Sequence, residues 1–263
     1  MKTLFLKIFY TLRKLPILKR LSNSLLRRIL FKIKKDKFYY TFKDVTFFLN
    51  IRDSIDREFF MNGYYEEKQL NILSKSIKKY SINSFIDIGS NIGIYSILMA
   101  KNHSNLTIYA FEPHKDAFRR LKDNVNLNKF NNRIYLYNYA LSNKNGNSFL
   151  EAKNRFGLSQ SGGAKISDKG NIKIKYQAGD DLIKIKNEHI AIKIDTEGHE
   201  LFVLNGIKNL LVYNKVFLQI EIFPQNTNDV TKFLNNLGFQ LITKSQFTHQ
   251  KNILDYFFEK NFS

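Results

Sequence analysis

Runs of β-branched and aromatic residues alternate with helical patterns over the second two-thirds of the chain. The runs cover residues 85–88, 107–111, 134–139, 190–194, 216–222, 239–243 and 253–258. Apolar residues at helical spacing lie between them, over residues 92–102, 114–128, 199–211 and 227–237. This alternation predicts an α/β fold, with a parallel sheet that carries helices on both faces. No helical pattern separates the last two runs, so we expect them to pair antiparallel.

The preceding segment has a different pattern. Residues 38–61 alternate in aromatic and β-branched character around a turn at Lys43 and Asp44, which predicts a β-hairpin, and residues 66–79 have helical spacing. Residues 142–180 are the least regular stretch and suggest an insertion over the active-site face. We therefore predict three parts: a basic amphipathic helical segment over 1–37, a hairpin lead-in over 38–62 and the main domain over 63–263.

Charge is concentrated at the amino terminus. The net charge is +19, and residues 1–37 contain twelve Lys or Arg and one Asp. Apolar positions at helical spacing, including Ile8, Leu12 and Leu25, give this segment an apolar face beside basic ones. Three interpretations stay open: a helical pair packed on the domain, association with an anionic membrane surface, or an acidic partner. Its apolar runs are too short to span a bilayer or to form the core of a signal peptide.

Composition limits the function classes. The absence of Cys excludes disulfides and zinc–thiolate sites, and it fits a reducing cytoplasm. We therefore expect a cytoplasmic protein, with attachment to the inner face of the membrane through the tail as a hypothesis. Because more than half of the net charge lies in the tail, the remaining domain need not face a polyanion, and we expect no nucleic acid as partner.

A glycine turn follows the first main strand. Residues 85–88 run into Gly89-Ser-Asn-Ile-Gly93, and Glu112 follows the next strand about 20 residues later, the spacing at which a carboxylate meets ribose hydroxyls. The turn lacks the third glycine of a dinucleotide site and the lysine of a Walker loop. Asp87 would repel a pyrophosphate but could meet a cationic amino-acid group. The pattern favours an uncharged or cationic nucleoside over a nucleotide.

Three motifs together resemble the FkbM family of methyltransferases: F-I-D-I-G-S-N-I-G at 85–93, F-E-P at 111–113 and I-K-I-D-T-E-G-H-E at 192–200. The similarity runs from about Gly63 to the carboxyl end. It implies a class I methyltransferase sheet, Rossmann-like and seven-stranded with the last strand antiparallel, and S-adenosylmethionine as cofactor. It also implies O-methylation of a hydroxyl on a sugar, glycan or other natural product.

The resemblance also implies site residues. By position, the methionine moiety is surrounded by Asp87, Gly89, Asn91 and Gly93, and the ribose by Glu112, while the loop after residue 142 lies near the adenine. One departure is Gly179, where the family usually has an apolar residue; we interpret that position as structural.

The acceptor side is predicted at the end of strand 190–194. Asp195, Glu197 and His199 are candidates for the base that removes the acceptor proton, and a neighbouring carboxylate would raise the pKa of His199. Alternatively, Asp195 or Glu197 caps the following helix and His199 hydrogen-bonds to it. The two acids could also hold a divalent cation, but one Asp-x-Glu is too little to predict a metal.

Two further residues have open roles. Glu221 either contacts the substrate or pairs with a basic residue, and we expect Lys193 to point out between helices. The main alternatives to an O-methyltransferase are an RNA methyltransferase, which the charge supports, a nicotinamide-dependent dehydrogenase, and a non-catalytic membrane-associated protein with the same fold. Asp-Thr-Glu-Gly at 195–198 differs from the Asn/Asp-Pro-Pro-aromatic motif of base methylation at nitrogen.

Overall fold

The computed structural model describes residues 36–152, 154–155, 158–159, 163–246 and 253–262. Residues 1–35 of the helical segment predicted over 1–37 lie outside the described residues, and Lys37 already begins the first strand. The chain divides into two units, residues 1–65 with 154–160 and residues 66–153 with 161–263. None of the helices that the structure describes is long and apolar enough to cross a bilayer.

The first unit contains the predicted hairpin. Strands β1 (Lys37–Phe42) and β2 (Val45–Asn50) pair antiparallel, and the turn residues Lys43 and Asp44 both have positive φ, as a tight two-residue turn requires. The alternating pattern predicted strand as far as residue 61, but helix α3 (Ser54–Asn62) occupies the end of that segment. Asp53 caps it by accepting a hydrogen bond from the amide of Ile55 at 3.1 Å. The unit also contains the short pair β8 (Asn154–Arg155) and β9 (Leu158–Ser159).

The second unit is built on the predicted seven-stranded sheet. Its spatial order is β14-β15-β13-β12-β3-β4-β5, and only β15 runs antiparallel to its neighbours. The strands are β3 (Ser84–Ile88), β4 (Thr107–Phe111), β5 (Ile134–Tyr137), β12 (His189–Ile194), β13 (Lys215–Ile222), β14 (Gln240–Gln246) and β15 (Leu254–Lys260). This is the class I methyltransferase order. The order reverses between β3 and β12, where folds of this kind place their ligands.

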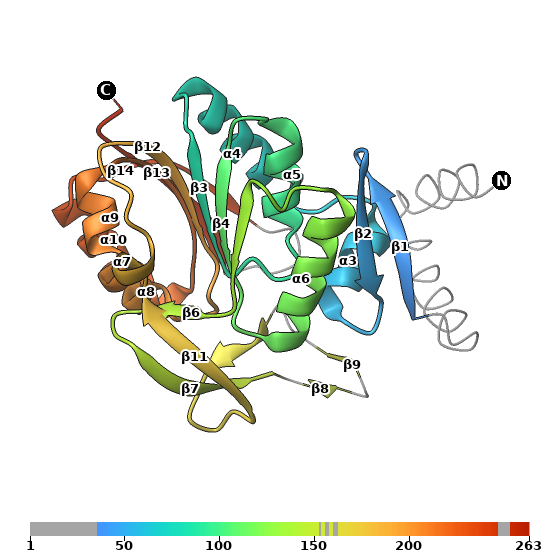
Figure 1. Cartoon of the computed structure of the whole chain (residues 1–263). Helices are drawn as coiled ribbons and strands as arrows, with labels where there is room; N and C mark the ends of the chain where they lie inside the picture. The colour runs from blue at the N-terminus through green and yellow to red at the C-terminus, as the bar shows by residue number, and fades with distance from the viewer. Residues whose placement is uncertain (1–35, 153, 156–157, 160–162, 247–252, 263) are drawn as a thin grey trace. The chain divides into compact units, whose positions relative to one another are not determined.

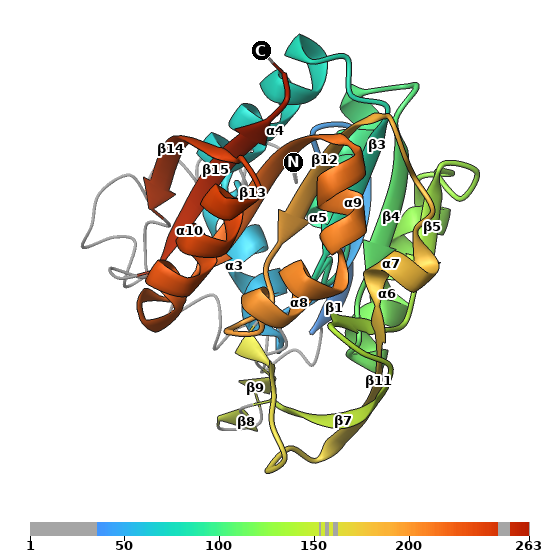
Figure 2. The ribbon, with the colours of Figure 1, turned by 90° about the vertical axis from the view of Figure 1, so that its left-hand side faces the viewer.

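Helices cover both faces of this sheet (Figures 1 and 2). One face carries α4 (Glu67–Lys79), α5 (Ile94–Asn102) and α6 (Lys115–Leu127). The other carries α8 (Glu200–Gly206), α9 (Lys208–Tyr213) and α10 (Thr227–Asn236), with the one-turn helices α7 (Gly179–Leu182) and η2 (Pro224–Asn226) nearby. The single helix predicted over 199–211 is therefore two helices.

Gly206 at the end of α8 lies very close to the backbone of Ser142. A Cβ at this position would overlap the backbone oxygen of Ser142, so only glycine allows the close approach of the two segments.

The stretch predicted to be irregular forms a second sheet. Its order is β10 (Lys165–Ile166), β7 (Gly146–Glu151), β11 (Ile172–Ala178) and β6 (Ala140–Ser142), around a small core of Ala140, Leu150 and Ile174. Both ribbon views place β7 and β11 beyond the carboxyl ends of the main strands. Gly179 is buried, and a Cβ there would overlap the side chain of Ile207. The departure from the family pattern at this position is thus a packing feature.

Candidate active site

The glycine turn lies directly beside the end of β12. Gly89 has φ +85°, and a Cβ there would overlap the backbone oxygen of Asp195. Gly93 has φ +88°, and its Cβ would come within 2.5 Å of Leu121. Asn91 between them is also left-handed, with φ +49°. Since L side chains rarely adopt such φ values, the two glycines allow both the turn and its close contact with the acceptor-side loop.

Glu112 connects the glycine turn to the second strand. Its buried carboxylate follows β4 and accepts hydrogen bonds from the amide of Asn91 at 2.9 Å and the amide of His114 at 2.7 Å. Burial raises the pKa of Glu112 to about 7, although the two amide hydrogen bonds oppose the rise. A buried carboxylate at the carboxyl edge of the sheet has the chemistry expected of a ribose ligand; that role stays a prediction.

Asp87 has an oxygen without a partner. Its side chain is fully buried at the end of β3, and Oδ2 accepts a hydrogen bond from the hydroxyl of Ser96 at 2.6 Å. Oδ1 has no hydrogen-bond partner among the described residues. Burial raises the pKa of Asp87. Buried polar atoms normally have partners, so this oxygen is a candidate acceptor for a ligand amino group.

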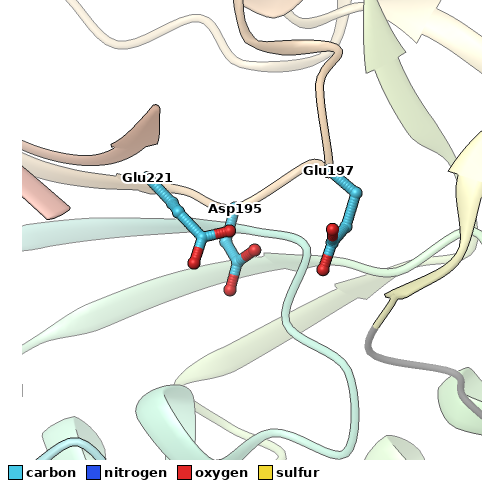
Figure 3. A group of neighbouring side chains, drawn as sticks. All are labelled: Asp195, Glu197 and Glu221. Atoms are coloured by element: carbon cyan, nitrogen blue, oxygen red, sulfur yellow. The ribbon is translucent and has the colours of Figure 1, made fainter. Parts of the chain in front are cut away.

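Three carboxylates converge where β12 and β13 end. Asp195, Glu197 and Glu221 each have an oxygen within 4.8 Å of the others, and Figure 3 shows the three side chains pointing to the same side of the backbone. Glu197 and Gly198 both have positive φ, which turns the chain sharply after the strand. Burial, followed by the negative charge of Asp195, raises the pKa of both Glu197 and Glu221. The structure thus joins Glu221 to the two acids predicted from the motif.

The sequence suggested that Lys193 points out between helices, but the structure shows its side chain buried. It is only 4% exposed, and its Nζ donates a hydrogen bond to Oδ2 of Asp195 at 2.9 Å. The ammonium also lies 4.7 Å from the ring centre of Tyr95. Burial opposes its charge, but the carboxylates of Asp195, Asp87 and Glu66 raise its pKa. Residues i and i+2 of a strand share a face, so the spacing of Lys193 and Asp195 was a signal for this pair.

His199 lies apart from the carboxylate cluster. Its Nε2 is 3.0 Å from the hydroxyl of Ser142, and its ring stacks on Phe202. Burial lowers the pKa of His199 to about 4, so the predicted rise caused by a carboxylate is wrong. His199 is neutral at pH 7. It is a weaker base than expected, and whether it takes part in catalysis stays a prediction.

Glu200, which sequence reasoning missed, stabilises the loop between β12 and α8. Its Oε1 accepts hydrogen bonds from the amide of Gly198 at 2.7 Å and the hydroxyl of Thr196 at 3.4 Å. Its Oε2 accepts one from the side-chain amide of Asn226 at 3.1 Å. Helix α8 begins at Glu200, and its N-cap residue His199 makes no side-chain cap hydrogen bond, so the structure describes no cap from Asp195 or Glu197. A Glu in the first turn of a helix is the available signal.

Three carboxylates at such distances are also the oxygen ligands that a divalent cation prefers. Lys193 already places a positive charge against Asp195 in this cluster. We therefore assign no metal to it.

Comparisons with known proteins identify the family of the chain. A model of the methyltransferase FkbM domain matches residues 87–241, more than half of the chain. The hexuronic acid methyltransferase AglP of Haloferax volcanii is 32% identical over 152 residues. That match covers 57% of this chain and 60% of AglP, so the chain spans less than two thirds of the length of this curated relative.

Solved methyltransferase structures show more remote likenesses. TYW2 of M. jannaschii in complex with AdoMet has a TM-score of 0.43 and 13% identity, over 86% of this chain and 87% of that one. The tRNA m1G37 methyltransferase of M. jannaschii has a TM-score of 0.46 and 14% identity, over 86% and 55%. The family match, the strand order and the three motifs lead to one conclusion: the chain belongs to the FkbM family of methyltransferases.

Proposed function

We propose that the protein is an S-adenosylmethionine-dependent O-methyltransferase that acts on a hydroxyl of a sugar, glycan or related natural product. The observation that carries this proposal is the contact between Gly89 and the backbone oxygen of Asp195. It brings the predicted cofactor turn against the loop that holds the three carboxylates. A methyl donor and an acceptor hydroxyl would therefore meet at one edge of the sheet, and in-line displacement needs little more than such positioning.

The residues present fit S-adenosylmethionine. Oδ1 of Asp87 lacks a partner among the described residues and suits the amino group of the methionine moiety, and Glu112 suits the ribose hydroxyls. When bound, S-adenosylmethionine supplies an electrophilic methyl group. The side chains that would act on the acceptor are those of Asp195, Glu197 and Glu221. Asp195 removes the hydroxyl proton, whereas Glu197 and Glu221, whose pKa values are raised by burial, donate hydrogen bonds that orient the acceptor.

The acceptor class is supported by the relative, which is named for its action on a hexuronic acid. A sugar offers several hydroxyls, and a cluster of carboxyl groups that both donate and accept hydrogen bonds suits such a polyol. We therefore propose sugars and glycans as the first acceptors to screen, with transfer of a labelled methyl group as the readout.

Isothermal titration of S-adenosylmethionine and its demethylated product tests the cofactor assignment. We expect micromolar binding by the wild type, a large loss in Asp87→Ala and Glu112→Ala, and no loss in Asp123→Asn, whose side chain is exposed on α6. NAD, titrated in parallel, should not bind. A folded wild type that binds neither S-adenosylmethionine nor its product would refute the proposal.

We also propose that residues 1–37 attach the protein to an anionic membrane surface on the cytoplasmic side, because this segment combines apolar helical spacing with most of the net charge. The test compares flotation of the full chain and of a 36–263 truncation with vesicles that contain phosphatidylserine. We expect only the full chain to float, and less of it at high salt. Equal recovery of both would contradict the proposal.

A further inference from the structure

Lys193 occupies a position that packing alone would give to an apolar residue. It lies in β12, the strand between β3 and β13, and its neighbours along the chain are fully buried isoleucines. Only 5% of its side chain is exposed. Taking an ammonium out of water is strongly unfavourable, and a buried ion pair is often no more stabilising than an apolar pair of the same volume. Stability therefore does not explain a lysine here.

Ionisable groups from several elements lie near Lys193. They are Asp87 on β3, Glu66 before α4, Tyr95 on α5, Asp195 and Glu197 after β12, and Asp255 on β15. Glu221 on β13 belongs to the same group through its cluster with Asp195 and Glu197. Within the described part of the chain, the ammonium donates its hydrogen bond to Oδ2 of Asp195, at 2.9 Å. Of the neighbouring carboxylates that the structure describes, the Lys193 ammonium thus hydrogen-bonds to that of Asp195.

Neutral donors serve three of the other acids near Lys193. Asp87 accepts a hydrogen bond from Ser96, and Glu66 accepts one from Tyr95 at 2.6 Å. Asp255 accepts hydrogen bonds from two glutamine side chains, those of Gln69 at 3.2 Å and Gln219 at 3.0 Å. Hydroxyl and amide donors satisfy a carboxyl group without requiring that it be charged. An ammonium at hydrogen-bond distance favours the charged form specifically, and Asp195 has that partner.

We propose that Lys193 is a positioning residue that keeps Asp195 charged and oriented, so that Asp195, and not Glu197 or Glu221, takes the proton from the acceptor hydroxyl. The inference rests on the proposed O-methyl transfer. As the bond between the acceptor oxygen and the methyl carbon forms, the bond between that carbon and sulfur breaks, and the sulfonium becomes a neutral thioether. The hydroxyl proton moves to the carboxylate of Asp195, which later releases it to water.

Tyr95 completes the arrangement. Its ring centre lies 4.7 Å from Nζ of Lys193, within the range of a cation–π interaction, and its hydroxyl is anchored on Glu66. The ring replaces part of the water that the ammonium has lost, without offering a second acceptor in competition with Asp195. Among the residues that the structure describes, Lys193 therefore has one strong hydrogen-bond acceptor and one aromatic contact, which fixes its direction.

The first test needs neither cofactor nor acceptor. In protein labelled with carbon-13 at the aspartate carboxyl carbons, the Asp195 resonance is assigned by its loss in Asp195→Asn. We expect the carboxylate position at pH 7 in the wild type, in Lys193→Arg and in Lys122→Gln, an exposed control on α6. Lys193→Met should move it to the position of the protonated acid. A carboxylate signal in Lys193→Met, or a protonated Asp195 in the wild type, would overturn the inference.

The second test measures methyl transfer to a glucuronic acid glycoside, or to the acceptor found by screening. We expect kcat of Lys193→Met to fall by about 10²-fold or more, the usual worth of a general base, while calorimetric affinity for S-adenosylmethionine is unchanged. Higher pH should restore much of the activity, because it recharges Asp195; a merely structural role predicts no such recovery. Partial rescue in Lys193→Arg is expected.

Three outcomes separate the inference from the proposed function. No binding of S-adenosylmethionine to the wild type defeats the proposed function, while the resonance of Asp195 still decides whether Lys193 charges it. A dependence on added Mg²⁺ that EDTA abolishes would make Asp195 a cation ligand and overturn the inference. Should Lys193→Met fail to fold, Lys193→Gln supplies the same loss of charge with a polar side chain.

Discussion

At the scale of single residues, the carboxyl group of Glu112 makes cofactor binding depend on pH. Burial raises its pKa to about 7, so it changes charge near neutrality. The ionised form accepts hydrogen bonds more strongly than the neutral acid, and a hydrogen bond to a charged group contributes about 1.5–3 kcal/mol. We expect affinity for S-adenosylmethionine to weaken by up to about tenfold between pH 8 and pH 6, because the ionised fraction of a group with a pKa of about 7 falls by that factor. Glu112→Gln should bind S-adenosylmethionine weakly, with an affinity that does not depend on pH. If the variant kept the pH dependence of the wild type, Glu112 would not be its cause.

Gly89 offers a second test at this scale. Gly89→Ala puts a Cβ into the backbone oxygen of Asp195, and φ is also positive. Gly238→Ala is a matched control, since φ there is +83° and nothing lies within 4 Å of the added Cβ. The control should lose only the conformational term, about 1–2 kcal/mol of unfolding free energy, whereas Gly89→Ala should lose at least about twice that. Urea unfolding measures both. Equal losses would mean that the contact with Asp195 is not tight.

The residue scale also shows what the sequence could not reveal. The motif at 192–200 predicted Asp195 and Glu197 as neighbours because they follow one strand, but Glu221 joins them from β13 only once the strand order is known. The environment of His199 is equally non-local. Its partner Ser142 comes from β6, which is 57 residues earlier in the chain, and the burial that lowers its pKa has no sequence signal.

At the scale of elements, the loop between β12 and α8 depends on Glu200. Glu200→Ala leaves the amide of Gly198 and the side-chain amide of Asn226 without this partner, which should cost about 1–3 kcal/mol of unfolding free energy. The loop should open more often, so hydrogen exchange at the Gly198 amide should become faster. Glu200→Gln keeps one acceptor oxygen and should lie between the two. Exchange at Gly198 that is equal in all three proteins would show that other contacts hold the loop.

The helices and strands could be predicted best where a strand of the main sheet is covered by helices on both faces. Strands β3 and β12 are buried almost throughout, so each appears as an apolar run with clear ends that one charged residue interrupts, Asp87 in β3 and Lys193 in β12. The sheet formed by β6, β7, β10 and β11 was missed because β7, β10 and β11 are only partly buried and carry Lys or Asn among the apolar positions. Helix α3 was missed because Phe59 and Phe60 continue the aromatic pattern of the hairpin before it.

At the scale of the whole molecule, buried acids make stability depend on pH. Burial, and then the neighbouring Asp255, raise the pKa of Glu66 to about 8, and burial raises that of Glu112 to about 7. An acid whose pKa is higher in the folded state stabilises the fold fully below its unfolded value, about 4.5, and this stability is lost as pH rises through the folded value. We therefore expect the unfolding temperature without ligand to fall between pH 5 and pH 9.

Glu66→Gln separates this effect from a general dependence on net charge. Glutamine has the shape of the protonated acid and can still accept the hydrogen bond from Tyr95. An acid with a raised pKa lowers the free energy of unfolding by up to about 1.4 kcal/mol per pH unit between its pKa in the unfolded state and its pKa in the folded state. The variant should therefore match the wild type at pH 5 and be more stable at pH 9. Asp123→Asn, at an exposed site, should follow the wild type throughout. Only Glu66→Gln removes a carboxyl group with a raised pKa, whereas both variants remove one negative charge. Equal changes in the unfolding temperature of the two variants would therefore mean that net charge, and not Glu66, causes the dependence of stability on pH.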